Sequence, residues 1–345
     1  MPEALIQPDP AGIYCRAGSF HIDPWLAVHT AVLTHAHADH ARLGSGVYYC
    51  AAPSEPLLRI RLGPGAVLKP IPYGEQFTLG DTRVSFHPAG HILGSAQVRV
   101  EAGPSGASEI WVASGDYKRD PDPTCAPFEV VPCDVFITEA TFALPIYRWD
   151  PPQATASQML DWWDQCAAQD KACVVFGYSL GKIQRAIAEL LRAERARGRE
   201  PRPMYLHGAA AALTEAYRSL GVELPPTQLM PDKTRRGIFG GSMTFAPPSA
   251  AGSLWMRRFG SDDKYQTAFA SGWMTVRGVR RRGGYDRGFT LSDHADWPSL
   301  LQTIHQTRAS RVLVTHGNID SFVRYLRETG INAEPLRTAY GAEED

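Results

Sequence analysis

Short apolar runs separated by turn-forming residues fill the part of the chain before residue 140. Runs of this length, rich in β-branched and aromatic side chains and bounded by glycine, proline or aspartate, are typical of β-strands. Pairs of runs flank tight turns: residues 77–79 and 83–87 surround Gly80-Asp81, and residues 97–100 and 110–113 surround residues 103–106. We therefore expect hairpins and short strands here, with one short helix that begins near Pro53.

The pattern changes after residue 145. Residues 157–166 carry apolar side chains at helical spacing, residues 172–178 form a continuous apolar run, and residues 181–191 again have helical spacing. The same order repeats at 203–206 and 210–220. Strands that alternate with helices predict a parallel sheet with crossover helices, so this stretch is expected to form a separate α/β unit.

The last part of the chain returns to strands that end at histidines. Residues 288–294 and 311–316 are each expected to form a strand that ends at a histidine, with helices at 299–308 and 321–328. Residues 314–317 also mirror residues 32–35, since each tetrapeptide carries a Thr-His pair after an apolar side chain.

A polar cluster follows the apolar run at residues 31–33. Its ligand-forming side chains are His35, His37, Asp39 and His40. Imidazole nitrogen and carboxylate oxygen suit Zn²⁺ in an open catalytic site. His35 and His37 could reach one ion from the strand end, and Asp39 and His40 could reach a second. The alternative is a solvated polar loop, which this density of ligand types disfavours.

Further candidate ligands fall where other predicted strands give way to loops. They are Asp23, His91, Asp116, Glu139, His294 and His316. Any one of them alone is more often a turn residue than a ligand, but loops at one edge of a sheet are where the ligands of a single site are expected. The remaining histidines, His21, His29, His87, His207 and His305, have no comparable placement and are interpreted as structural.

Composition narrows the class of protein. The chain has 345 residues, 44% hydrophobic and 21% charged, with a net charge of −1, so any affinity for nucleic acid must come from local basic clusters. No apolar run approaches the length of a membrane span, and the N-terminus lacks the pattern of a secretory signal. Six cysteines without a CxxC pair indicate reduced thiols in a cytoplasmic protein.

Basic residues gather at 233–236, 257–258 and 277–287, and the last of these runs is glycine-rich. Such a run is as often a solvated face as a binding surface, but beside a metal site it becomes a candidate contact for phosphates. The turn at 179–182, which ends at Lys182, could also present backbone N–H groups and an ammonium to a phosphate; an ordinary βα loop is the equal alternative.

Together these motifs resemble a known family. The HxHxDH motif at 35–40, with Gly90-His91, Gly115-Asp116 and Thr315-His316-Gly317, resembles the metallo-β-lactamase fold. Glu139, His294 and His316 resemble the three motifs of its β-CASP branch of nucleases, and residues 181–185 and 271–273 resemble segments of the β-CASP cassette. Within that branch the chain is most similar to the bacterial ligase-associated DNA exonucleases, which are relatives of Artemis.

The resemblance implies an αββα sandwich (residues 1–146 and 290–345) with an inserted α/β β-CASP domain (residues 147–289). It implies two divalent metal ions, with Zn²⁺ favoured over Mn²⁺. His35, His37 and His91 would bind the first ion, Asp39, His40 and His316 the second, and Asp116 would bridge them.

The resemblance also suggests roles for residues around the ions. His294 would act as the general acid and Glu139 would orient it, while Asp23 would support a ligating histidine. Lys182, Ser271 and Gly272 are the candidates for phosphate contacts.

Three functions follow as hypotheses. The first is a DNA exonuclease of repair, with the 5′ end favoured as the entry point and a DNA ligase and a helicase as partners. The second is an RNA-processing nuclease, because His316 stands where the RNA-cutting members usually have histidine. The third is a small-molecule hydrolase, which the cassette and the arginine clusters disfavour. A scaffold without metal is also disfavoured, since every ligand position is filled.

Overall fold

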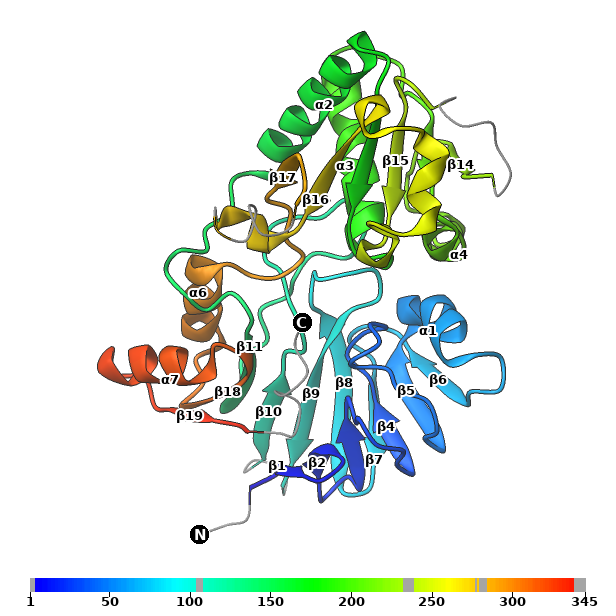
Figure 1. The fold of residues 1–345 in the computed structure, drawn as a ribbon. Coiled ribbons are helices and arrows are strands. Elements are labelled where there is room, and N and C mark those ends of the chain that lie inside the picture. Colours follow the sequence, from blue (N-terminus) through cyan, green and yellow to red (C-terminus); the bar gives the residue numbers. More distant parts are fainter. Residues whose placement is uncertain (1–3, 104–107, 232–238, 277, 279–283, 338–345) are drawn as a thin grey trace. The chain divides into compact units, whose positions relative to one another are not determined.

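The computed structural model describes residues 4–103, 108–231, 239–276, 278 and 284–337 (Figure 1). Contacts divide the chain into two compact units: residues 1–148 with 294–345 form the first, and residues 149–293 form the second. The second unit is thus inserted into the sequence of the first. Its boundaries fall after residues 148 and 293, whereas the sequence suggested boundaries after residues 146 and 289.

Two β-sheets form the framework of the first unit. Sheet A has the order β1-β2-β3-β4-β5-β6, and sheet B has the order β19-β18-β11-β10-β9-β8-β7. The strands of sheet A are β1 (Ile6–Asp9), β2 (Gly12–Cys15), β3 (Phe20–Ile22), β4 (Thr30–Val32), β5 (Val47–Ala51) and β6 (Leu68–Ile71). The strands of sheet B are β7 (Gln76–Leu79), β8 (Thr82–Pro88), β9 (Ala96–Ala102), β10 (Glu109–Ala113), β11 (Val135–Ala140), β18 (Arg311–Gly317) and β19 (Ala333–Pro335).

The two sheets bury a hydrophobic core between their inner faces. Val135 and Ile137 of β11 point into this core together with Phe20 and Ile22 of sheet A. Phe136, between them in sequence, points to the opposite face of sheet B, as the period of two along a strand requires. Because both faces of β11 are covered, its first half, Val135-Phe136-Ile137, is a continuous apolar run rather than an alternating one.

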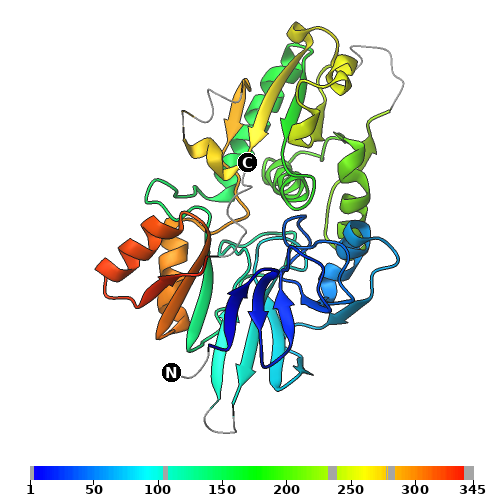
Figure 2. The same cartoon turned by 60° about the horizontal axis from the view of Figure 1, so that its bottom comes forward.

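Helices cover the outer face of sheet B. Figures 1 and 2 show α6 (Trp297–Thr307) and α7 (Ile319–Glu328), in orange to red, against that face. Leu300 of α6 and Phe322 of α7 are fully buried in the same cluster as Phe136. In sheet A, α1 (Glu55–Leu62) connects the parallel strands β5 and β6 and buries one apolar face.

The second unit is built on one parallel sheet with the order β14-β13-β15-β12-β16-β17. Its strands are β12 (Ala172–Phe176), β13 (Met204–Leu206), β14 (Thr227–Leu229), β15 (Met243–Ala246), β16 (Tyr265–Ala270) and β17 (Arg287–Phe289), and its α-helices are α2 (Pro152–Ala168), α3 (Lys182–Ala196) and α4 (Gly208–Ser219). Short 3-10 turns include η5 (Gly272–Thr275). Cys173 and Val175 of β12 pack with α2 and α3, whereas Val174 and Phe176 enter a separate cluster. The alternation of strand and helix expected from the sequence is present in this mixed α/β chain.

The structure corrects the strand expected over 288–294. β17 ends at Phe289 and belongs to the sheet of the second unit, so His294 does not lie at a strand end. The carbonyl of Thr290 accepts from Thr155 Oγ1 at 3.0 Å, and that of Ser292 accepts from the Arg185 guanidinium. These two carbonyl groups therefore accept hydrogen bonds from side chains and not from the N–H groups of a neighbouring strand.

β11 also differs from expectation, because it continues to Ala140 and includes Glu139 rather than ending before it. Of the basic positions noted above, Lys233, Arg235, Arg236, Arg277 and residues 280–282 lie outside the described residues. Among the described residues, no helix combines the length and apolar character needed to cross a bilayer.

Gly94 offers a test of the loop that carries His91. Its φ is +78°, and a Cβ there would lie 2.4 Å from the backbone of Ser54. Gly74 has a similar φ of +77° but nothing within 4 Å, so it measures the conformational cost without a clash. We expect Gly74→Ala to lower the free energy of unfolding by about 1–2 kcal/mol and Gly94→Ala by about 3 kcal/mol or more, because the clash adds to the strain. Urea denaturation measures both, and equal losses would contradict the packing described for this loop.

Candidate metal centre

The first ligands lie on the turn that follows β4. Leu33 extends the strand, its N–H donating to the Tyr49 carbonyl at 2.8 Å, and the chain then turns so that the N–H groups of His40 and Ala41 both donate to the His37 carbonyl. This turn brings the side chains of residues 35–40 to the ends of β3 and β4. β3, β4, β10, β11 and β18 all end near the candidate ligands, so the centre lies at the carboxyl ends of strands from both sheets.

Four side chains offer ligand atoms within 4.8 Å of one another: His35, His37, His91 and Asp116. His37 Nδ1 lies 3.1 Å from His35 Nε2 and 3.1 Å from His91 Nε2. Asp116 Oδ2 lies 3.6 Å from His35 Nε2 and 3.7 Å from His91 Nε2. Ligands about 2.0–2.1 Å from a tetrahedral ion are about 3.4 Å apart, so the donor set fits a zinc-like ion.

A second set of ligands adjoins the first through the same carboxylate. Asp116 Oδ2 lies 3.5 Å from His40 Nε2, and Asp39 Oδ2 lies 3.6 Å from that nitrogen. The His316 ring packs edge to face on the His40 ring, with the two centroids 5.5 Å apart. One oxygen of Asp116 is therefore close to ligand atoms of both sets, which is the placement a bridging carboxylate needs.

Asp23 orients two of these histidines. Asp23 Oδ2 lies 2.8 Å from His40 Nδ1 and accepts from Thr34 Oγ1 at 2.5 Å. Thr34 Oγ1 lies 3.0 Å from His35 Nδ1. Because the threonine hydroxyl donates to Asp23, it accepts from His35, and the Nδ1–H of each histidine is used away from the centre. The Nε2 atoms of His35 and His40 are left as lone-pair donors toward an ion.

A β-bulge between β11 and β18 sets the direction of the His316 side chain. Thr138 pairs with Val314 and Ala140 pairs with Gly317, so Thr315 and His316 together face Glu139 alone. His316 has a φ of +57°, a conformation that costs energy for a residue with a Cβ. Bulges of this kind bend a strand and redirect one side chain, and here the redirected ring is the one beside His40.

Burial and charge set the protonation of the cluster. Burial, reinforced by His40 and His37, holds the pKa of His35 well below its ordinary value, and burial lowers the pKa of His316 to about 4. A lowered pKa favours the neutral imidazole, the form that binds a metal.

His40 behaves in the opposite way. Burial disfavours its charge, but Asp116, Asp39 and Asp23 outweigh burial and raise the pKa of His40 well above its usual range. Burial also opposes the charge on Asp116, yet His40 and His294 keep the pKa of that carboxyl well below normal. Three carboxylates around one imidazolium leave an excess of negative charge, and a divalent cation would replace the proton of His40 there.

Glu139 and His294 form a pair beside the first ligand set. His294 Nδ1 lies 2.9 Å from Glu139 Oε2, and Glu139 Oε1 accepts from the Tyr117 N–H at 2.8 Å. The His294 ring centroid is 4.6 Å from that of His91. The Glu139 side chain is 1% exposed and that of His294 is 20% exposed, so the histidine is the member of the pair that a substrate can reach.

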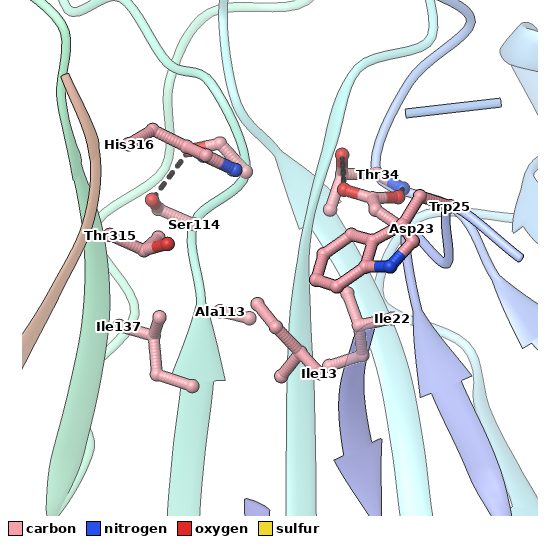
Figure 3. Close-up of a pocket in the computed structure, with 11 residues that line it drawn as sticks. Ile13, Ile22, Asp23, Trp25, Thr34, Ala113, Ser114, Ile137, Thr315 and His316 are labelled. Carbon is pink, nitrogen blue, oxygen red and sulfur yellow. Dashed lines mark hydrogen bonds between the residues drawn. The ribbon is translucent and has the colours of Figure 1, made fainter. Parts of the chain in front are cut away.

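Figure 3 shows a pocket that borders the centre. Its apolar lining comes from Ile13 and Ile22 of sheet A and from Ala113 and Ile137 of sheet B. Asp23, Trp25, Thr34, Thr315 and His316 also line it. The centre thus sits on an apolar layer, where charges interact more strongly than in water.

The structure brings together every metal-ligand candidate noted in the sequence, together with Asp23, Glu139 and His294. Sequence reasoning missed the supporting roles of Thr34 and of the Tyr117 peptide. For Thr34 a signal existed, because the Thr-His pair occurs twice at strand ends, whereas nothing in the sequence marks a particular N–H group.

Lys182, Ser271 and Gly272 belong to the second unit and are buried there. The Lys182 ammonium forms an ion pair with the Asp293 carboxylate, and the Ser271 hydroxyl accepts from the Trp273 N–H at 3.3 Å. Both side chains are 3% exposed in these positions, and the phosphate contacts expected of them stay predictions.

Comparisons with known proteins add two likenesses. A probable DNA ligase of Opitutus terrae is 31% identical over 324 residues, which span 93% of this chain but 30% of that protein. A crystal structure of a protein of unknown function from Enterococcus faecalis shares the fold, with a TM-score of 0.57 and 12% identity over 90% of this chain and 80% of that one. No protein-family model matches the sequence. The chain therefore spans about a third of the length of the relative with which it shares sequence.

The role of Asp23 can be tested by measuring zinc affinity. Asp23→Asn keeps the shape, and asparagine tolerates the φ of +43° at this position. The variant replaces the oxygen that faces His40 Nδ1 by an amide donor, so we expect zinc affinity to fall about 10- to 100-fold. Competition with a chelator measures the change.

Asp9→Asn is the matched control, because Asp9 pairs with His21 at 2.8 Å on another part of sheet A. It should leave zinc affinity unchanged. Equal affinities in Asp23→Asn and the native chain would contradict the orienting role.

Proposed function

We propose that this chain is a two-metal nuclease that hydrolyses phosphodiester bonds of DNA, an exonuclease of the β-CASP branch of the metallo-β-lactamase fold. The observation that carries the proposal is the position of Asp116 Oδ2, which lies within 3.5–3.7 Å of nitrogens from His35, His40 and His91. A carboxylate shared by two sets of ligands is the arrangement used to hold two ions about 3.5–4 Å apart.

The fold also supports the proposal of a β-CASP nuclease. Two facing sheets, with helices on the outer side of sheet B, have the layer order expected of an αββα sandwich. A parallel α/β unit inserted between residues 148 and 294 matches the position of a β-CASP domain. The motifs at residues 35–40 and 294–317 predict these same two features, the layered sheets and the inserted unit.

The ligands assigned by this proposal follow the two sets described above. His35, His37 and His91 would hold one ion, Asp39, His40 and His316 would hold the other, and Asp116 would serve both. Zinc suits this donor set better than manganese does. When bound, the two ions supply an acidic water and neutralise charge on the phosphate.

Residues of the chain would handle the proton transfer that hydrolysis also needs. Glu139 accepts the Nδ1–H of His294, which fixes the tautomer and leaves Nε2 as the site that exchanges a proton. A protonated His294 donates to the oxygen that leaves the phosphorus, and the buried Glu139 stabilises the imidazolium before transfer. Asp23 and Thr34 hold the ligand rings in place while this happens.

DNA is favoured over RNA because the sequence relative is named as a probable DNA ligase, an activity that joins DNA ends. A nuclease segment within a ligase would prepare the ends that the ligase seals, so a DNA ligase is the partner proposed here, with a helicase as a second. Entry at a 5′ end and a role in repair follow from the resemblance of the motifs to that family, and a place in the cytoplasm follows from the cysteine pattern of the sequence. His316 keeps an RNA nuclease as the alternative, and a small-molecule hydrolase would have no use for the second unit.

The proposal can be tested on end-labelled strands. We expect the purified chain to shorten single- or double-stranded DNA from the 5′ end when zinc or manganese is supplied, and a chelator to stop it. Asp116→Ala should lose both bound metal and activity, since it removes a ligand of both ions.

Matched RNA strands separate the two nucleases: rapid loss of RNA with intact DNA would favour the alternative. Full metal occupancy of Asp116→Ala, measured by elemental analysis, would contradict the bridging role.

The role of His294 has its own test. His294→Ala should keep its metal and lose about 100-fold or more in the rate of hydrolysis, as the loss of a general acid does. His305→Ala is a suitable control, because His305 is exposed on α6 in the same part of the first unit. A native rate in His294→Ala would remove this residue from the mechanism.

A further inference from the structure

The last turn of α1 carries two exposed arginines whose surroundings differ. The Arg59 guanidinium pairs with the Glu55 carboxylate at 3.1 Å and donates to the Ala66 carbonyl at 2.9 Å. Arg61 Nε instead donates to the Ala36 carbonyl at 3.4 Å, and no carboxylate among the described residues pairs with it. The helix dipole favours a cation in a last turn, but it does not explain why Arg61 reaches a loop that lies 25 positions earlier in the chain.

The carbonyl that Arg61 contacts belongs to the candidate metal centre. Ala36 lies between His35 and His37, which are both ligands of the first set. The Nε–H group therefore holds the guanidinium beside that set. Its two NH₂ groups donate to none of the described residues, and the side chain is exposed.

The helix itself is fixed against both loops that carry the first ligand set. Ser54, directly before α1, packs so closely on the loop of His91 that a Cβ at Gly94 would lie 2.4 Å from its backbone. The other end of α1 reaches Ala36 through Arg61, and three leucines between these ends are buried. The position of Arg61 relative to the ligands is thus set by a rigid element rather than by a loose loop.

A phosphodiester is the acceptor that suits this arrangement. A guanidinium is planar and offers parallel N–H donors, which match the geometry of two phosphate oxygens. The centre itself is rich in carboxylates, because Asp23, Asp39 and Asp116 surround His40. An exposed cation beside these carboxylates would attract an anionic strand that they would otherwise repel.

We propose that Arg61 binds a backbone phosphate of the DNA strand, next to the phosphate that is hydrolysed. The inference rests on the proposed function, because it takes DNA as the substrate. It adds a cationic contact in the first unit, whereas the phosphate contacts suggested by the sequence all lie between residues 179 and 287.

Salt dependence of binding tests the contact. The probe is a fluorescein-labelled single strand with phosphorothioate linkages, which resist hydrolysis, and its anisotropy is measured with the zinc-loaded full chain at increasing NaCl. Arg61→Gln should weaken binding at low salt by about 10-fold. The slope of log K against log [NaCl] should become shallower by about 0.7, the value for one phosphate contact on a single strand.

Arg59→Gln is the matched control, since it removes the same charge two positions away from a side chain whose partners lie within α1 and the segment that follows it. It should leave the slope unchanged. Equal changes of slope in the two variants would show a general effect of net charge and overturn the proposed contact.

Neutral linkages locate the phosphate. Methylphosphonates, which carry no charge, are placed one at a time along the strand. At one position the neutral linkage should weaken binding to the native chain about as much as Arg61→Gln does, and it should cost nothing further in that variant. Losses that add in full at every position would contradict a direct contact, because only groups that interact fail to add.

The competing role for Arg61 is support of the loop of residues 35–40 through the Ala36 carbonyl. Phosphate binding predicts that Arg61→Gln raises KM and leaves kcat within about twofold, with native zinc affinity and melting temperature. Arg61→Lys, which keeps the charge, should recover most of the slope. A loss of zinc affinity in Arg61→Gln together with an unchanged slope would assign the residue to loop support and overturn the inference.

Binding and hydrolysis fail separately. A native chain that binds DNA through Arg61 but cleaves neither DNA nor RNA would end the proposed function and support this contact. A native chain that cleaves DNA, with native affinity and slope in Arg61→Gln, would overturn the contact alone. A native chain that binds no DNA would overturn both.

Discussion

The carboxylate of Asp116 is the interaction on which the rest of the centre depends. Burial penalises its charge, yet the surrounding imidazoles hold the pKa of this group well below normal. A buried anion of this kind persists only when cations or hydrogen-bond donors face it. His35, His40 and His91 converge on one of its oxygens, so this single carboxylate joins the two sets of ligands. Burial lowers the pKa of His35 and of His316, whereas the carboxylates around His40 outweigh burial and raise its pKa. His40 in turn outweighs burial and lowers the pKa of Asp39.

The candidate ligands lie at strand ends, and the local backbone conformation sets the direction of their side chains. Asp23 and His316 both have positive φ, and a bulge between β11 and β18 turns His316 toward His40. Each costs energy that the facing sheets and their core must offset. Ser19, Asp170 and Arg308 also have positive φ, so this conformation is not peculiar to the centre, but at Asp23 and His316 it sets the direction of side chains that belong to it. The core between sheets A and B, by contrast, follows the simple alternation of a pleated strand.

Many of the candidate ligands could be predicted because the motif that marks them lies within a few consecutive residues. Residues 35–40 carry four ligands in one motif, and the strand before them is an apolar run, so both the ligands and their position at a strand end can be seen in the sequence. The fate of residues 288–294 could not be predicted in the same way. An apolar run indicates a strand but does not say which sheet it joins, and β17 joined the sheet of the second unit. The phosphate contact suggested for Lys182 stays a prediction, and the sequence could not show that its ammonium pairs with Asp293, 111 residues further along the chain.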